Sequence, residues 1–114
     1  MIGTAEALAM GTALGMDAKV LTKIMSVSTA RCHSVDTYNP VPGVLDTAPA
    51  SRNYERGFAT ELMHKDVGLA LDAAQSVGVK TDLGKHSYDI YGELMKQGLS
   101  KKDFGVIYDV LKKK

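Results

Sequence analysis

Residues 57–74, "GFATELMHKDVGLALDAA", decide how the rest of this sequence is interpreted. Wound as a helix at 100° per residue, the segment has one apolar stripe. The stripe consists of Phe58, Leu62, Leu69 and Ala73. Asp66 falls inside this stripe and Lys65 falls at its edge, although the spacing predicts that the stripe packs against other helices. A mostly polar flank lies elsewhere on the helix and is made of Glu61, His64, Gly68, Asp72 and Gln75.

The two charged side chains have structural as well as functional interpretations. Lys65 could lay its methylenes on apolar surface while its ammonium reaches water. An unpaired buried carboxylate is costly, so Asp66 requires a hydrogen bond, a cation or a wet cleft. Lys65 is not its obvious partner, because adjacent helical residues do not face each other. The structural interpretation ties Asp66 to Arg52, Arg56 or a backbone amide, and the functional one predicts a polar site beside Phe58.

Composition narrows the class of protein. The chain has 114 residues, of which 45% are hydrophobic and 24% charged, as is ordinary for one small globular domain. A net charge of +1 gives no general attraction for a phosphate backbone, so nucleic acid is not an expected partner. No apolar run approaches membrane-spanning length, so no membrane partner is expected either. Cys32 is the single cysteine and excludes an internal disulfide framework.

Helical spacing accounts for the sequence before the central segment. Residues 2–15 carry a ridge of small side chains, and Gly15 is a plausible stop. Asp17 is a plausible N-cap for the next helix, which ends in "SVST", and a short helical turn is expected around "RCHSVDTY". All three prolines fall in residues 39–57, which we interpret as an ordered loop.

Two further helices are predicted after a break at "GVKTD". The first presents Tyr88, Tyr91, Leu94 and Met95 on one face, and Gly98 closes it. Ser100 and Asp103 resemble a capping box with a shorter acid before the last apolar stripe, made of Phe104, Ile107, Tyr108 and Leu111. Lysines 112–114 suit the dipole at a helix C-terminus. The predicted fold class is therefore all-α, a helical bundle of about five main helices.

Signals for other chemistry are weak. Cys32 and His33 are adjacent, but a zinc site needs three or four ligands. Glu61 and His64 have the E-x-x-H spacing of di-iron bundles without a second copy, so no metal is expected. No glycine-rich phosphate-binding loop is present, so this chain does not hold a nucleotide by a glycine loop of its own.

Four stretches together resemble the β-hydroxyacid dehydrogenase family: "AEALAMGTALGMD", "TYNPVPGV", "GF" followed by "LMHKDVGLA", and the final "KKDF". The F-x(6)-KD-x-x-LA arrangement is shared across that family. "YNPVPGV" is narrower and is similar to the members that oxidise 3-hydroxyisobutyrate to methylmalonate semialdehyde in valine catabolism.

The resemblance implies an oxidoreductase with NAD as cofactor and a small 3-hydroxy acid as substrate. It also implies that residues 1–114 are the all-helical C-terminal substrate and dimerisation domain of a two-domain dehydrogenase whose Rossmann domain is absent. The family's catalytic lysine belongs to a K-x-x-N motif upstream of "AEAL", so no catalytic residue is assigned in this chain. By resemblance, Lys65 reaches the cofactor near its nicotinamide end, and Phe58 and Asp66 line the cleft beside it.

Three further expectations follow from the resemblance. The isolated chain is expected to be inactive, the protein is expected to form a homo-oligomer, and its eukaryotic relatives place it in the mitochondrial matrix. The choice between NAD and NADP is left open here. The alternative from another functional class is a stand-alone helical oligomerisation or interaction module that uses the small-residue ridge of its first helix.

Overall fold

The computed structural model describes residues 1–112, and its regular elements are helical. In chain order these are α1 (Ile2–Ala13), α2 (Ala18–Ser26), α3 (His33–Asp36), the 3-10 helix η1 (Pro49–Arg52), α4 (Thr60–Ser76), α5 (Asp82–Lys96), the 3-10 helix η2 (Phe104–Val106) and α6 (Ile107–Lys112). Strand-like pairing within this range is limited to an isolated antiparallel bridge between Ala59 and Asp103. Of the three lysines predicted to complement the last helix, residues 113 and 114 lie outside the described range.

Most predicted helix boundaries are confirmed, and each has a local cause. Gly15 adopts φ +91° after α1, a left-handed conformation that suits glycine at a helix end. The Asp17 side chain accepts a hydrogen bond from the Val20 N–H at 2.9 Å and so caps α2. Gly98 adopts φ +80° after α5, as expected of a helix stop.

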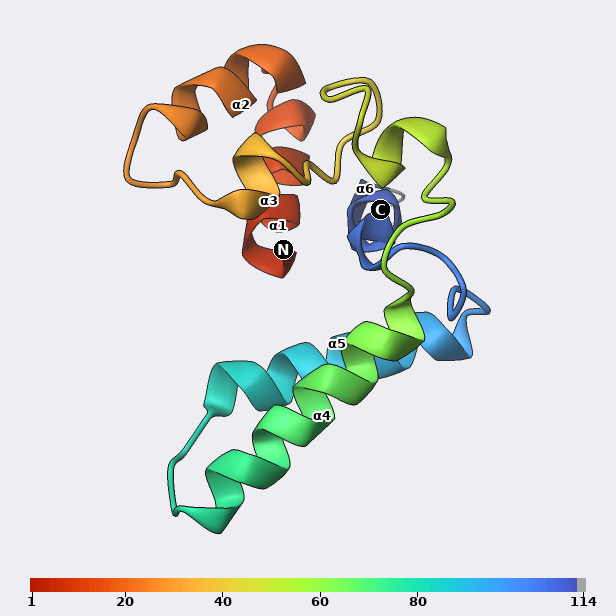
Figure 1. The fold of residues 1–114 in the computed structure, drawn as a ribbon. Helices are drawn as coiled ribbons and strands as arrows, with labels where there is room; N and C mark the ends of the chain where they lie inside the picture. Colours follow the sequence, from red (N-terminus) through yellow and green to blue (C-terminus); the bar gives the residue numbers. More distant parts are fainter. Residues whose placement is uncertain (113–114) are drawn as a thin grey trace.

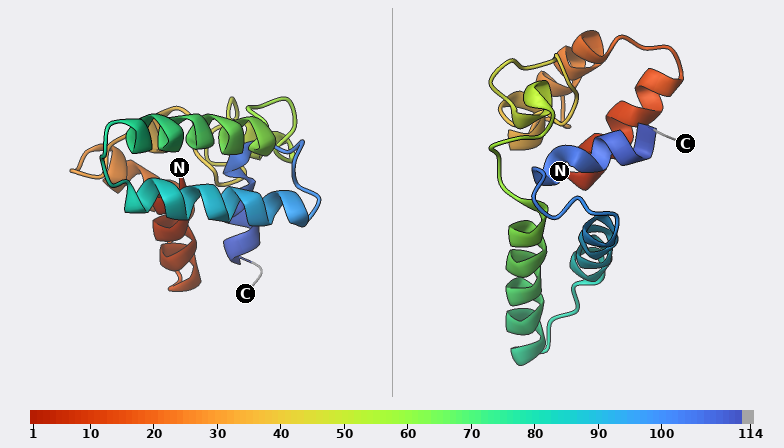
Figure 2. Two further views of the ribbon diagram at one scale, coloured as in Figure 1. Left: turned by 90° about the horizontal axis from the view of Figure 1, so that it is seen from below. Right: turned by 90° about the vertical axis from the view of Figure 1, so that its right-hand side faces the viewer.

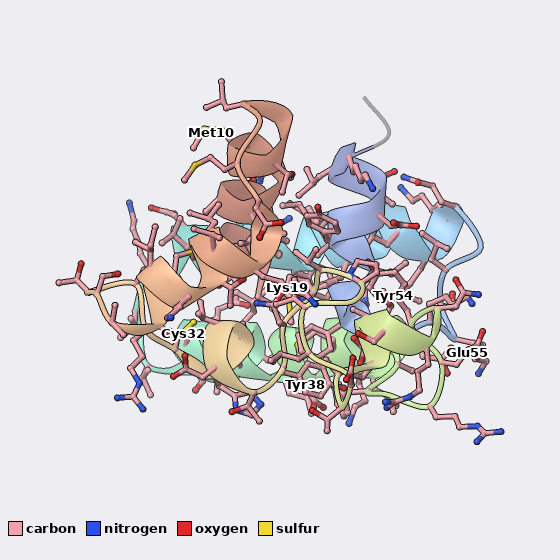
Figure 3. The ribbon with its side chains drawn as sticks, turned by 90° about the horizontal axis from the view of Figure 1, so that it is seen from above. Met10, Lys19, Cys32, Tyr38, Tyr54 and Glu55 are labelled. Atoms are coloured by element: carbon pink, nitrogen blue, oxygen red, sulfur yellow. The ribbon has the colours of Figure 1, made fainter. Side chains whose placement is uncertain are left out.

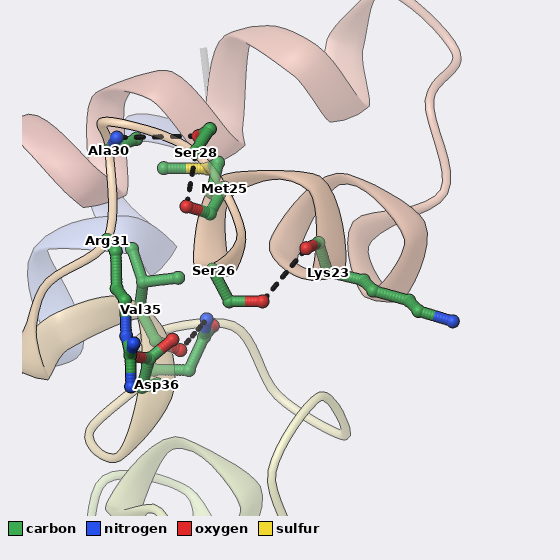
Figure 4. Close-up of polar contacts among 9 residues, drawn as sticks. Lys23, Met25, Ser26, Ser28, Ala30, Arg31, Val35 and Asp36 are labelled. Carbon is green, nitrogen blue, oxygen red and sulfur yellow. Dashed lines mark hydrogen bonds and ion pairs between the residues drawn. The ribbon is translucent and has the colours of Figure 1, made fainter.

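The connection from α2 to α3 is a tight polar turn (Figure 4). Ser26 and Ser28 each donate a hydroxyl hydrogen bond to the backbone carbonyl three residues earlier, at 2.8 and 3.0 Å. Arg31 then bonds the Asp36 carboxylate at 2.8 Å across the short helix. α2 ends at Ser26. The helix α3, His33–Asp36, confirms the short helical turn expected around "RCHSVDTY".

The capping box predicted at Ser100 and Asp103 is wrong. Asp103 itself caps η2, because its Oδ1 accepts the Gly105 N–H at 2.8 Å. Ser100 has a different role, since its carbonyl accepts the N–H of Glu61 at 3.1 Å, beside a bond from Thr60 N–H to the Lys102 carbonyl at 2.8 Å. The chain ahead of η2 is therefore held to the start of α4 and does not begin a helix.

The helices form two parts rather than one bundle (Figure 1). One part contains α1, α2, α3, η1 and α6, and the other is an antiparallel hairpin of α4 and α5 that projects from it (Figure 2). A single core joins them at the base of the hairpin, where Tyr91 and Leu94 of α5 pack with Leu8 of α1 and Tyr108 of α6. The distal end of the hairpin is uncovered, and its Leu83 side chain is 85% exposed.

The predicted bundle of about five main helices is therefore corrected. The molecule measures 43 × 32 × 26 Å with a radius of gyration of 14.4 Å, against about 13 Å for a compact domain of this length. A bundle aligns its helices side by side, whereas here the hairpin of α4 and α5 projects away from the other helices. Helical periodicity in the sequence identifies an apolar face but not the partner that covers it.

The proline-containing segment 39–57 is an ordered loop, as predicted. Tyr54 is buried and donates its hydroxyl to the Pro40 carbonyl at 2.9 Å. Arg52 donates to the backbone carbonyls of Thr47, Glu55 and Arg56 at 2.8 to 3.2 Å. Figure 3 labels Tyr54 within this loop and Tyr38 on the segment that leads into it.

Among the described helices, none is long and apolar enough to cross a membrane.

Candidate cofactor-binding site

Of the three residues proposed from the sequence, Phe58 lies just before α4, and Lys65 and Asp66 lie in its second turn. Phe58 is 37% exposed and precedes the helix by two residues, while the Lys65 and Asp66 side chains are 60% and 49% exposed. Leu62 and Leu69 of the same stripe are 42% and 60% exposed. The prediction that this stripe meets other helices is therefore wrong for the part of the chain that the structure describes.

The opposite face of α4 packs on α5. His64 stacks on Tyr88 with ring centroids 3.8 Å apart. A Cβ added to Gly68 would lie 3.1 Å from the Tyr88 ring, and one added to Gly92 would lie 3.3 Å from His64. Two members of the expected polar flank, His64 and Gly68, thus form the helix contact, because a small residue and a planar ring permit close approach.

Lys65 and Asp66 pair with each other, contrary to the expectation from helix geometry. The Lys65 Nζ lies 2.8 Å from Asp66 Oδ1. Adjacent side chains on a helix diverge, but the lysine stem is long enough to turn back when no neighbouring helix occupies the space. Arg52, the predicted structural partner, instead holds loop carbonyls. An exposed ion pair of this kind contributes roughly 0–1 kcal/mol, so Lys65 remains available to a ligand.

Phe58 is held from both sides of its backbone. Its N–H donates to Asp103 Oδ2 at 2.8 Å and lies 3.1 Å from the Tyr38 hydroxyl oxygen, which also accepts it. Its carbonyl accepts the Phe104 N–H at 2.9 Å. The Phe58 ring meets the Phe104 ring edge to face at 6.1 Å. The ring is thereby oriented before α4 begins.

Tyr38 and Asp103 are residues at the site that sequence reasoning missed. The Tyr38 hydroxyl donates to Asp103 Oδ2 at 2.6 Å, and its ring stacks on Phe104 at 5.5 Å. Burial, together with the hydrogen bond to Asp103, raises the pKa of Tyr38 to about 12. Both residues lie in stretches that carry the family resemblance, "TYNPVPGV" and "KKDF". The sequence therefore marked these stretches, but neither residue was given a role at the site.

A cavity of about 340 Å³ lies between the two parts of the molecule. Ile2 of α1, Met63 of α4, Tyr91 of α5 and Phe104 of η2 are among its lining residues. Lys65 and Asp66 are not among its lining residues. Phe104 therefore lines this cavity and also contacts the Phe58 ring.

The donors at the start of α4 limit what part of a dinucleotide this chain could hold. The N–H groups of Thr60 and Glu61 bond to the Lys102 and Ser100 carbonyls, and those of Leu62 and Met63 bond to Ala59. A diphosphate therefore finds no free amide cradle at this helix end. The exposed Lys65 ammonium fits a single ribose, phosphate or carboxylate contact, and the half-exposed Phe58 ring fits an apolar or planar group.

Metal ligation has no support among residues 1–112, where no group of three or more His, Cys, Asp or Glu side chains converges. Two of the histidine rings stack on tyrosines. The His33 and Tyr38 ring centroids are 5.8 Å apart, and His64 stacks on Tyr88. Burial raises the pKa of the exposed Cys32 thiol, but hydrogen bonds from Thr4 and from the backbone of Val35 and Ser34 bring it below its ordinary value overall.

Comparison with known proteins gives a consistent family. Residues 1–111 match a family model described as "NAD-binding of NADP-dependent 3-hydroxyisobutyrate dehydrogenase". The mitochondrial 3-hydroxyisobutyrate dehydrogenase of Bos taurus is 50% identical over 98% of this chain, which covers 33% of that protein. An NAD-dependent L-serine dehydrogenase of Pseudomonas aeruginosa is 49% identical over 94% of the chain and 36% of that protein. The chain thus spans about a third of the length of the curated relatives it matches.

The solved structures agree with the sequence relatives. The structure of Mycobacterium tuberculosis 3-hydroxyisobutyrate dehydrogenase with L-serine superposes with a TM-score of 0.90 at 37% identity. The superposition covers 96% of this chain and 38% of that one.

The matched family corrects the predicted domain assignment. The chain was expected to be a C-terminal substrate and dimerisation domain, with the absent Rossmann domain as the dinucleotide-binding domain of the enzyme. The family that covers residues 1–111 is itself described as NAD-binding. The expected domain assignment came from the resemblance, which gave dinucleotide binding mainly to the Rossmann domain and only a few cofactor contacts to this chain.

Proposed function

Because this chain belongs to the NAD-binding family of 3-hydroxyisobutyrate dehydrogenase, we propose that it is part of an NAD-dependent oxidoreductase acting on a small 3-hydroxy acid. The substrate proposed is 3-hydroxyisobutyrate, which is oxidised to methylmalonate semialdehyde in valine catabolism. The eukaryotic relatives named for this activity, among them those of Bos taurus, Homo sapiens and Dictyostelium discoideum, are named as mitochondrial, which supports placing the enzyme in the mitochondrial matrix.

The exposed face at the start of α4 carries this proposal. Phe58, Lys65 and Asp66 are accessible together on it, although the same stripe is apolar enough to be buried in an ordinary helix. The proposed role of Lys65 is to donate a hydrogen bond to the cofactor near its nicotinamide end. Phe58 contributes an apolar wall, and Asp66 holds the ammonium of Lys65 in place.

The bound cofactor would accept a hydride from the carbon that bears the substrate hydroxyl. This chain's own residues bind and orient in the proposed scheme, and none is assigned as the base that takes the hydroxyl proton. The 114-residue chain by itself is therefore expected to produce no NADH.

Two substrates of the same chemistry are suggested by relatives. L-Serine and 3-hydroxyisobutyrate are both carboxylic acids with a hydroxyl on carbon 3, and relatives of this chain are named for each. They differ at carbon 2, which carries an ammonium in serine and a methyl group in 3-hydroxyisobutyrate. We propose 3-hydroxyisobutyrate because several relatives that are 50% identical to this chain carry that name.

The test is steady-state NADH formation by the full-length enzyme with each of the two acids. We expect the larger kcat/KM with 3-hydroxyisobutyrate and none for the 114-residue chain freed of host enzymes. A larger kcat/KM with L-serine would reassign the substrate within the same class. Absence of NADH formation with either acid, in enzyme shown to be folded and to bind NAD, would overturn the proposal.

A stand-alone interaction module is the alternative function. The exposed apolar side chains after α1 and at the end of the hairpin favour it, since Leu14 and Leu83 are 78% and 85% exposed. Such a module would associate without any response to NAD. NAD titration of the full-length protein therefore separates the two functions.

A further inference from the structure

The carboxylate of Asp103 is buried where three segments of the chain meet. The residue is only 2% exposed. Its Oδ2 accepts the Tyr38 hydroxyl at 2.6 Å and the Phe58 N–H at 2.8 Å, and its Oδ1 accepts the Gly105 N–H at 2.8 Å. None of the ion pairs among residues 1–112 includes Asp103. A buried charge without a cation depends on such hydrogen bonds for its stability.

Backbone bonds place Asp103 in register with the chain that leads into α4. The Asp103 N–H donates to the Tyr54 carbonyl at 2.8 Å, and the next residue, Phe104, donates to the Phe58 carbonyl at 2.9 Å. The peptide groups on both sides of Phe58 are therefore bound to residues 103 and 104. The position of the Phe58 ring is set by a segment 45 residues away in the sequence.

Gly57 makes this approach possible. A Cβ at Gly57 would overlap Asp103 Oδ2 and would lie 2.7 Å from Cγ of Pro49. Gly57 does not have a positive φ. Glycine is therefore required at this position because a side chain would not fit, and not because of the backbone conformation. The glycine ahead of Phe58 and the aspartate of "KKDF" are thus parts of one contact.

The turn immediately before Gly57 is strained. Asn53, Tyr54 and Arg56 have φ of 57°, 57° and 55°, a left-handed conformation that costs side chains other than glycine free energy. Such a turn persists only when surrounding bonds hold it, and the Arg52 guanidinium and Asp103 supply them. The strain lies next to the residue proposed to contact the cofactor.

We propose that Asp103 is a positioning residue, which aims the Phe58 ring and the first turn of α4 at the cofactor without touching it. The inference rests on the proposed function for its consequence in NAD binding. Its structural part, control of the Phe58 backbone by the Asp103 carboxylate, stands separately on the contacts above.

The variant Asp103→Asn isolates this role. The amide has the shape of the carboxylate but only one accepting oxygen, and its NH2 group can donate but not accept. Whichever way the amide turns, one accepting oxygen is lost. Either the Gly105 N–H loses its acceptor, or the Phe58 N–H keeps only the longer bond to the Tyr38 hydroxyl, and an unsatisfied buried donor is costly. Asp109→Asn is the matched control, because the same chemical change falls on α6 at a side chain with no hydrogen bond to any residue in the described range.

The experiment measures NAD affinity without substrate, kcat/KM, and amide exchange of the Phe58 N–H in the full-length enzyme. We expect Asp103→Asn to weaken NAD binding roughly tenfold and to speed exchange at Phe58 by a similar factor, with Asp109→Asn unchanged. In a Phe58→Ala background, Asp103→Asn should change NAD affinity by less than about twofold, because the group it positions is gone.

Additive effects of Asp103→Asn and Phe58→Ala would overturn the inference, since a purely structural residue acts independently of the ring. Unchanged exchange at Phe58 would overturn it as well. If Asp103→Asn does not fold, Tyr38→Phe tests the same contact, because it removes one bond to Oδ2 and leaves the carboxylate. We expect Tyr38→Phe to cause a smaller loss of NAD affinity than Asp103→Asn, and to cause no loss when Phe58 is already alanine. A loss that adds to that of Phe58→Ala would overturn the inference.

Failure of the proposed function has a different signature. Unchanged NAD affinity in both Phe58→Ala and Lys65→Ala would remove these residues from the cofactor site and overturn the proposed function. The exchange rate at Phe58 would still decide whether Asp103 controls that backbone.

Discussion

The ion pair between Lys65 and Asp66 joins two adjacent, exposed side chains at 2.8 Å. Solvent screens such a pair, so it adds little to the free energy of unfolding. Its value lies in holding a mobile lysine close to the helix surface that also carries Phe58. The same exposure means that Asp66 does not compensate a buried cation.

Lys65→Ala should therefore weaken NAD binding with little loss of stability. A charge-assisted hydrogen bond is worth roughly 1.5–3 kcal/mol, or about ten- to a hundredfold in affinity. Asp66→Asn should have the smaller effect on affinity, and neither variant should change stability by more than about 1 kcal/mol. NAD titration of the full-length variants measures the affinity, and thermal unfolding measures the stability. Lys80→Ala, at the far end of the hairpin, is the control, and an effect of equal size there would contradict the assignment.

Gly57→Ala should destabilise the protein. The added Cβ meets the Asp103 carboxylate and the Pro49 ring, neither of which is the free end of a flexible side chain. Overpacking of this kind costs roughly 1–3 kcal/mol, measurable by urea unfolding. Gly3→Ala is the matched control in α1, because nothing lies within 4 Å of the position that its new methyl group would take, and it should be neutral or slightly stabilising. Equal stability of the two variants would contradict the proposed close contact.

Tyr38 should contribute to the loss of stability at alkaline pH. Its pKa is about 12 when folded, against 10.0 for an ordinary tyrosine, so the folded state favours the neutral phenol. This contribution is complete below pH 10.0 and is lost as pH rises toward about 12, because the unfolded chain releases its proton first. Tyr38→Phe should give a shallower decline of unfolding free energy across this window. An identical slope for the two proteins would show that folding does not raise the pKa of Tyr38.

At the scale of elements, the hairpin of α4 and α5 depends on close packing at glycine. Gly68 and Gly92 face Tyr88 and His64 across the interface, and the Tyr88 and His64 rings stack at 3.8 Å. Small residues here let the helices approach, whereas the apolar stripe of α4 stays open on the other side. The packing thus leaves the candidate cofactor face uncovered.

Gly92→Leu should separate the two helices. The new side chain would occupy the position of the His64 ring and cost roughly 1–3 kcal/mol, despite the better helix propensity of leucine. His86→Leu, at an exposed position of the same helix, is the control and should change stability by less than about 0.5 kcal/mol. Thermal unfolding distinguishes them, and equal melting temperatures would contradict the packing described for Gly92.

For the whole molecule, the projecting hairpin exposes apolar side chains at its distal end. Val77, Val79 and Leu83 are 72%, 57% and 85% exposed there. Contiguous apolar surface favours association, so we expect a dimer or larger assembly. Sedimentation velocity of the full-length protein, with Leu83→Lys as the variant expected to weaken association, measures this. A monomer over a wide range of concentration would contradict the expectation.

The sequence by itself determined most helices and their ends, because caps and stops act locally. Asp17 caps α2 with a bond to a residue three positions away, and Gly15 and Gly98 relieve a steric conflict within their own residues. Tyr91 and Leu94 were also identifiable as core, since a helical period marks one face as apolar. These properties depend on neighbours within a turn or two of chain.

Only the tertiary structure decided which face of α4 is covered and how Phe58 is held. His64 and Gly68, polar or small in sequence, contact α5, while Leu62 and Leu69 remain open. The sequence pattern around Asp103 predicted only local capping, and Oδ1 does cap η2. Its Oδ2 instead binds Tyr38 and Phe58, which are 65 and 45 positions away in the sequence. Periodicity specifies an apolar direction around one helix axis, but the partner on that side is set by contacts between distant segments, which no local pattern encodes.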